Sequence, residues 1–153
     1  MTAPVHYAIG AASALFIQNF LPTSASTQTR IIAAFVAAII SHIAADTVPH
    51  AEHFLKGRYL AMELVVETIV MLAVLVGASR SPLVATVILA GMAGAAAPDG
   101  LGMISRYVDW PALSWVDDKI HLSHGKFNLF YASFFLQSVI TVLCSIYVRI
   151  KSA

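Results

Sequence analysis

Five long apolar stretches make up most of this sequence and constrain its fold more than any other feature. They run roughly over residues 4–21, 30–47, 60–78, 82–98 and 126–148. A helix needs roughly 20 mostly apolar residues to cross the hydrocarbon core of a bilayer. The composition agrees, because 59% of the residues are hydrophobic and only 11% are charged. We therefore expect an all-α integral membrane bundle of about five transmembrane helices.

The length and charge of the chain limit its organisation and its partners. No linker, repeat or charged tail divides the 153 residues, so we expect a single transmembrane domain over residues 1–153. The net charge of +1 and the scattered basic residues form no basic patch, which argues against nucleic acid as a partner. Aromatic residues in the segment 103–116 are typical of a headgroup region and indicate a short interfacial helix there.

Small residues mark the fourth apolar stretch. Gly91, Gly94 and the alanines at 95–97 form a face that predicts close packing against a neighbouring helix, and we expect this helix to lie at the centre of the bundle. Pro98 and Gly100 are expected to break the helix, leaving Asp99 at the mouth of the bundle.

The titratable residues are sorted sharply between the two faces of such a bundle. The starts of the first, third and fifth helices share one face with the ends of the second and fourth. All 6 histidines and all 8 acidic residues fall on this face, which we call the site face. The opposite, basic face carries Arg30, Arg80, Arg149 and Lys151. This sorting predicts a functional site at the site face.

The strongest local pattern is the sequence SHIAADTVPH at residues 41–50. His42 and Asp46 are four residues apart and project from one side of a helix, a spacing that lets two side chains bind one metal ion. Pro49 disfavours helical geometry at the residue before it, so we expect His50 to turn back toward the same point. Histidine and carboxylate ligands suit zinc best here, with manganese or iron as alternatives.

Other residues on the site face are candidates for the same centre. Asp99 is expected at the same depth as Asp46, as a further metal ligand. His6, one turn into the first helix, faces the same level and would be a ligand or an orienting group.

Proton transfer has its own candidates. Glu67 lies about two turns into the third helix, where a charge costs roughly 2.5 to 3.5 kcal/mol and normally needs a partner or a function. His121 and His124 form an i,i+3 pair that ligates metal, serves as acid and base, or caps the fifth helix. Catalytic acid and base are assigned to these three residues.

An early histidine before a Gly/Ala-rich helix, the SHxxxDxxPH pattern, a later Pro-Asp and a histidine pair together resemble a known family. This is the YdjM-like family of LexA-regulated inner-membrane metal-dependent hydrolases. The resemblance covers most of the chain and implies a bacterial inner-membrane location. It also implies metal-binding and catalytic roles for His6, His42, Asp46, His50, Asp99, His121 and His124.

Two functions fit these residues. The first is a metal-dependent hydrolase acting on a lipid-borne phosphate or ester at the membrane surface, with the small residues at 94–97 leaving room for an acyl or prenyl chain. The second is a non-catalytic metal or proton transport protein, which needs polar groups continuing through the membrane. Beyond Glu67 the sequence offers few such groups: Gln18, Asn19, Ser133, Gln137 and Ser138. This favours a one-sided site.

A scaffold or regulator that has lost activity is a third alternative.

The orientation in the membrane has one indication in the sequence. The loops opposite the site are short and purely basic, which favours a site on the periplasmic side.

Overall fold

The structure is a computed structural model that describes residues 2–47, 58–77, 79–105, 108, 111–112 and 130–152. Long helices and no strands occur in these residues. The elements are α1 (Ala3–Gln18), α2 (Thr27–Asp46), α3 (Arg58–Met71) with its π-helical continuation η1 (Leu72–Val76), α4 (Pro82–Ser105) and α6 (Phe130–Ser152). The expected all-α bundle is confirmed.

Four helical segments are long and apolar enough to cross a membrane. They are Thr27–Asp46, Arg58–Val76, Pro82–Gly102 and Ser133–Ser152. Large apolar side chains on their outer surfaces are exposed, among them Ile40, Val66 and Leu143. In a helical bundle such surfaces suit contact with lipid tails, because the helices satisfy their own backbone hydrogen bonds. The chain is therefore a membrane protein.

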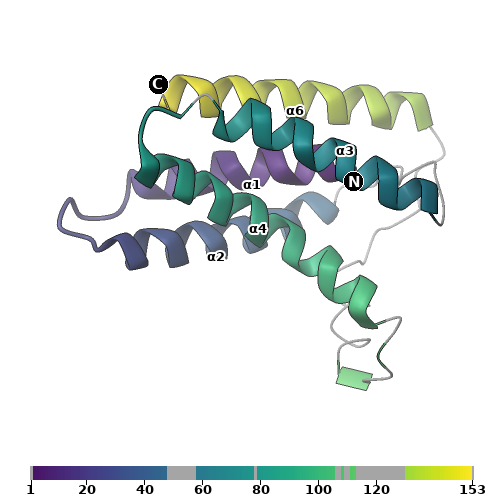
Figure 1. Ribbon diagram of the computed structural model, residues 1–153, viewed down its shortest axis with the longest axis horizontal. Helices are drawn as coiled ribbons and strands as arrows, with labels where there is room; N and C mark the ends of the chain where they lie inside the picture. The colour runs from purple at the N-terminus through teal and green to yellow at the C-terminus, as the bar shows by residue number, and fades with distance from the viewer. Residues whose placement is uncertain are drawn as a thin grey trace.

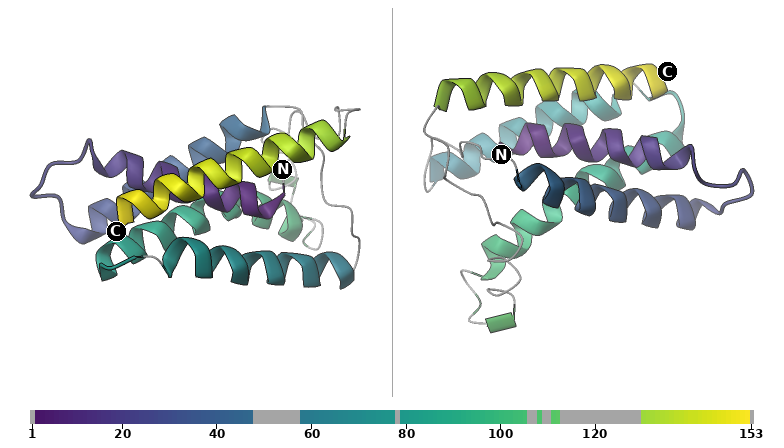
Figure 2. Two further views of the ribbon diagram at one scale, coloured as in Figure 1. Left: turned by 90° about the horizontal axis from the view of Figure 1, so that it is seen from above. Right: turned by 180° about the vertical axis from the view of Figure 1, so that it is seen from behind.

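The first helix, α1, occupies the centre of the bundle. It has 16 residues and contacts α2, α3, α4 and α6. Figure 2 shows α1 between α6 and α2 in the view from behind. The expectation that the fourth helix is central is thus wrong. Small residues on α1 explain the difference, because Ala8, Ala11 and Ala14 let neighbours approach it closely.

The helices alternate in direction, so the two faces predicted from the sequence are the two ends of the bundle. Figure 1 shows the N-terminus, the starts of α3 and α6 and the ends of α2 and α4 at one end. The C-terminus, the α1–α2 connection and the start of α4 lie at the other. These ends are the site face and the basic face.

Glycines bring α4 into close contact with both neighbours, which confirms the predicted packing. A Cβ added at Gly91 would lie 2.6 Å from the backbone oxygen of Gly10 on α1. A Cβ added at Gly94 would meet the backbone oxygen of Phe35 on α2. The expected room for a lipid chain beside residues 94–97 is therefore wrong at Gly94, because α2 fills the space there.

Two of the helix boundaries that differ from the sequence expectation have a clear physical reason. The second helix begins at Thr27 rather than near residue 30, because the Ser26 side chain accepts a hydrogen bond from the backbone N–H of Thr29 at 3.1 Å and caps it. The expected break at Pro98 and Gly100 is wrong, since α4 continues to Ser105. Membrane helices tolerate an internal proline because neighbouring groups compensate for the missing hydrogen bond.

The continuation of α4 also changes the segment 103–116. Residues 103–105 belong to α4 and residues 111–112 are helical. Most of the remaining expected interfacial helix lies outside the described residues.

Candidate metal centre

Three helices each bring a polar residue to the site face at the end of a row of small residues. The rows are His6, Gly10 and Ala14 on α1, Ala34, Ala38, His42 and Asp46 on α2, and Gly91, Ala95 and Asp99 on α4. Residues four apart share one side of a helix. The small residues let the three backbones approach, so the polar residues that continue each row converge.

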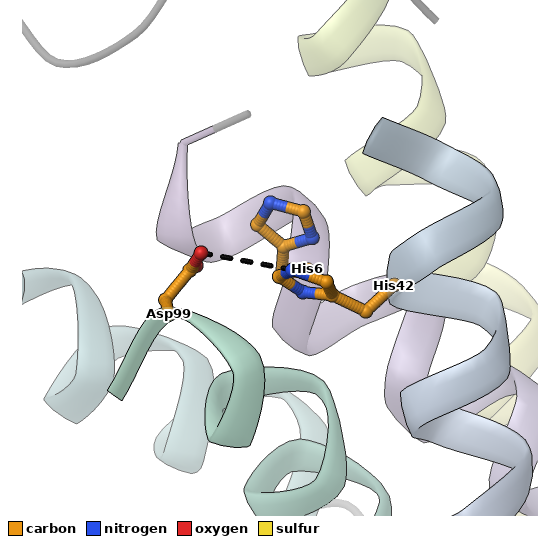
Figure 3. Close-up of side chains that lie close together, drawn as sticks. All are labelled: His6, His42 and Asp99. Carbon is orange, nitrogen blue, oxygen red and sulfur yellow. Dashed lines mark ion pairs between the residues drawn. The ribbon is translucent and has the colours of Figure 1, made fainter. Parts of the chain in front are cut away.

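The converging side chains are in direct contact. Asp46 places Oδ1 at 3.5 Å from Nε2 of His6 and Oδ2 at 3.1 Å from Nε2 of His42. Asp99 reaches toward the histidines from α4, with Oδ1 at 3.6 Å from Nε2 of His42 (Figure 3). The rings of His6 and His42 stack with their centroids 4.1 Å apart. One carboxylate therefore bridges two stacked imidazoles, and a second carboxylate approaches one of them.

The centre is buried on all but one side. His42 is 0% exposed and His6 is 2% exposed. The Asp46 side chain is 0% exposed, whereas that of Asp99 is 42% exposed. Asp99 thus marks an accessible edge of an otherwise enclosed group.

The donor atoms fit a single divalent metal ion. One ligand atom each from His6, His42 and Asp99 lies within 4.8 Å of the others. Ligands about 2.1 Å from a tetrahedral ion are about 3.4 Å apart, and Nε2 of His42 lies 3.6 Å from Oδ1 of Asp99. Asp46 does not belong to this group of three, but its carboxylate adds a second negative charge beside both histidines. This donor set is typical of zinc, manganese or iron sites.

Ion pairing without a metal is the competing interpretation of the same contacts. An ion pair involves a protonated His42 between Asp46 and Asp99, whereas a neutral His42 can donate one hydrogen bond from Nε2 to a carboxylate oxygen. If His6 were protonated as well, two positive rings would stack at 4.1 Å and repel each other. A metal ion compensates both carboxylates without charging either ring.

The structure brings four of the sequence candidates together: His6, His42, Asp46 and Asp99. His50, His121 and His124 lie outside the described residues. Glu67 lies on α3 with one carboxylate oxygen buried. Next to it, Thr68 shares a hydrogen bond of 3.0 Å with the hydroxyl of Tyr7 on α1. That hydrogen bond fixes this turn of α3 beside the turn of α1 that carries His6.

Sequence reasoning missed the hydrogen bonds that support the N-terminal end of α1. Thr2 donates its backbone N–H to Oε1 of Gln137 on α6 at 2.8 Å, and Gln137 donates to the Ser133 hydroxyl at 3.1 Å. The sequence predicts these α6 residues beyond Glu67, in the far half of the bundle, and this prediction is wrong. They lie on the site face because α6 begins at Phe130 and Gln137 is within its first turns. Their signal in the sequence is polar side chains inside an apolar span.

The residues His6, His42 and Asp99 could hold a metal ion, with Asp46 in contact with both histidines. The chain matches no family model, no curated protein and no solved structure.

Proposed function

We propose that this protein is a membrane-embedded, metal-dependent hydrolase that cleaves a phosphate or ester bond of a lipid at the membrane surface. One observation carries the proposal. Three helices bring His6, His42, Asp46 and Asp99 into one buried group with a single accessible edge. A structural metal site is normally closed by its ligands, whereas a catalytic site keeps a position open for substrate.

The four residues divide the tasks that hydrolysis requires. A bound divalent ion, with zinc the one expected, would polarise a substrate oxygen and activate water near neutral pH. His6, His42 and Asp46 are enclosed and would hold and orient the ion. Asp99 would complete the ligand set on the accessible side, where the substrate approaches.

Proton transfer is assigned to groups around this centre. Glu67 is proposed as a general acid or base because its helix is tied to α1 one residue from His6, through the Tyr7–Thr68 hydrogen bond. His121 and His124 are also proposed as general acid or base, on the basis of the sequence alone. His50 is proposed on the same basis as a fifth metal ligand.

A lipid substrate is supported by the depth of Asp99 in the bundle. The apolar span of α4 extends to Gly102, beyond Asp99. Leu101 and Ile104 are 40% and 50% exposed at this level, although residues two and five positions apart project from a different side of the helix than Asp99 does. An amphipathic substrate in the membrane would therefore bring a bond near its headgroup to the depth of the centre.

Transport is less well supported than hydrolysis. Among the described residues, the buried core between the two faces is apolar and includes Ala11, Leu75, Ile88 and Met92. Gln137 and Ser133 belong to the site face, which leaves even fewer polar groups for a path across the membrane. A one-sided catalytic site needs no such path.

Membership of the YdjM-like family and location in a bacterial inner membrane remain part of the proposal. So does the orientation. Lys and Arg residues number five on the site face and four on the basic face, so their count does not decide the orientation. The cytoplasmic side is proposed for the basic face because its loops are short and carry no acidic residue. The site face would then be periplasmic.

The test uses the purified, metal-loaded protein incubated with extracted membrane lipids, with products followed by mass spectrometry. We expect a lipid to be consumed by the wild type and by Ser41→Ala, whose hydroxyl donates to the Ala38 carbonyl outside the centre. Chelation or Asp99→Asn should stop the reaction. The opposite result would be that metal enters protein-containing vesicles while no lipid is consumed in a metal-dependent way. Transport would then replace hydrolysis as the proposed function.

A further inference from the structure

A cavity at the basic face, remote from the metal centre, has its own chemistry. It has a volume of about 190 Å³ and is lined by residues of α1, α2, α4 and α6. Gln18, Arg30 and Lys151 line it near the helix ends, and Leu15 and Val87 line it further into the bundle. A water molecule occupies about 30 Å³ in the liquid, so the space exceeds a single solvent site.

Arg30 is held in place as an uncompensated cation. Its guanidinium donates to the carbonyl oxygens of Pro22 at 3.0 Å, Ala25 at 3.3 Å and Thr23 at 3.4 Å. It also donates to Oε1 of Gln18 at 3.3 Å. All these acceptors are neutral, so they fix the position of the side chain without cancelling its charge. The cavity therefore has a preformed positive wall.

The surroundings of the cavity add positive charge. Lys151 lines it from the last turn of α6 and is exposed. The sequence contains no acidic residue at positions 18–30, 77–87 or 147–153. A ligand that complements this end of the bundle is an anion.

We propose that the cavity binds the phosphate headgroup of an anionic phospholipid. Arg30 and Lys151 attract the phosphate, and the glycerol and the start of an acyl chain pack on Leu15, Val84 and Val87. The apolar part of the lining favours a lipid over a free anion. Anionic lipids are also enriched in the cytoplasmic leaflet, which is the leaflet next to the basic face in the orientation proposed above. This site is separate from the proposed hydrolase centre.

The test is native mass spectrometry of the full chain with phosphatidylglycerol or phosphatidylcholine of identical acyl chains. The wild type should retain phosphatidylglycerol preferentially. Lys151→Gln should weaken this retention about fivefold, the factor that corresponds to about 1 kcal/mol per basic residue near an anionic surface. Arg149→Gln is the matched control, because it removes the same charge two residues away, outside the cavity lining, and should change retention less than twofold.

A second variant tests the cavity instead of the charge. Val84→Trp fills the space with no change of charge and should lower retention of phosphatidylglycerol by a similar factor. Metal content and melting temperature report whether each variant remains folded, and comparison is made among folded variants.

Three results would overturn the proposal. Equal retention of the two lipids would show that the cavity does not select an anionic headgroup. If Lys151→Gln and Arg149→Gln lost phosphatidylglycerol retention equally, the preference for this lipid would come from diffuse surface charge and not from the cavity. Displacement of phosphatidylglycerol by millimolar inorganic phosphate would show a free-anion site.

Discussion

The imidazole rings of His6 and His42 stack with their centroids 4.1 Å apart, although the two residues belong to different helices. Asp46 contacts Nε2 of both rings, one carboxylate oxygen to each. This arrangement concentrates nitrogen and oxygen donors in a space closed to solvent. A divalent cation could bind between His6, His42 and Asp99 beside this carboxylate, which gives the first prediction.

Metal removal should lower the stability of the wild-type protein. A ligand present at 100 times its dissociation constant stabilises the folded state by about 2.7 kcal/mol. For a chain of this size that corresponds to a shift of about 5 to 10 °C in melting temperature. Purified protein should contain at least one transition metal ion per chain, and a chelator should lower its melting temperature by this amount.

The Asp99→Asn variant separates metal binding from ion pairing. Asp99 is 42% exposed, so the amide should be accommodated without unfolding. We expect metal affinity to fall by about 10- to 100-fold or more, because loss of even an outer-shell partner has an effect of that size. The melting temperature of this variant should no longer respond to chelator. A wild-type protein that contains no metal and ignores chelator would support the ion-pair interpretation.

Close packing of α2 and α4 should be sensitive to one methyl group at Gly94. Gly94→Ala forces its Cβ against the backbone oxygen of Phe35 and should cost about 1 to 3 kcal/mol of unfolding free energy. Gly100→Ala is the matched control on the same helix, because a Cβ there meets no atom within 4 Å. Denaturation in mild detergent, read by circular dichroism, compares the two. Equal stability of both variants would contradict the close helix contact.

Glu67→Gln should separate catalysis from metal binding. The residue lies on α3, outside the group formed by His6, His42 and Asp99, so the variant should keep its metal. Loss of a general acid or base lowers the rate about 10²- to 10⁴-fold. The measurement is turnover of the lipid substrate together with elemental analysis. A full rate in this variant would remove Glu67 from the mechanism, and a loss of metal would make it a ligand.

The two faces should be accessible from opposite sides of the membrane. Ser24, in the α1–α2 connection, and Arg58, at the start of α3, are both exposed. Single cysteines at these positions, in a Cys144→Ala background, should react with a membrane-impermeant maleimide from opposite sides of sealed vesicles. Labelling of both from one side would contradict the alternating bundle.

Local periodicity determined a large part of this protein. Apolar stretches long enough to cross a bilayer determined the helices, because a backbone in lipid must satisfy its own hydrogen bonds. The alternation of spans placed the acids and histidines that the structure describes on one face. The contact between His42 and Asp46 also followed from sequence, since side chains four apart on a helix lie one above the other.

Only tertiary structure decided what lies across from that pair. His6 reaches His42 because α1 is central, and Asp99 reaches it because α4 continues through Pro98 instead of ending there. Both depend on how closely the backbones approach at Gly10, Gly91 and Gly94. The close approach of these backbones brings together residues that are distant in the sequence. Neither the helical period nor the hydropathy of the chain specifies such contacts. The sequence determined which residues reach the site face, and the packing of small residues decided which of them meet.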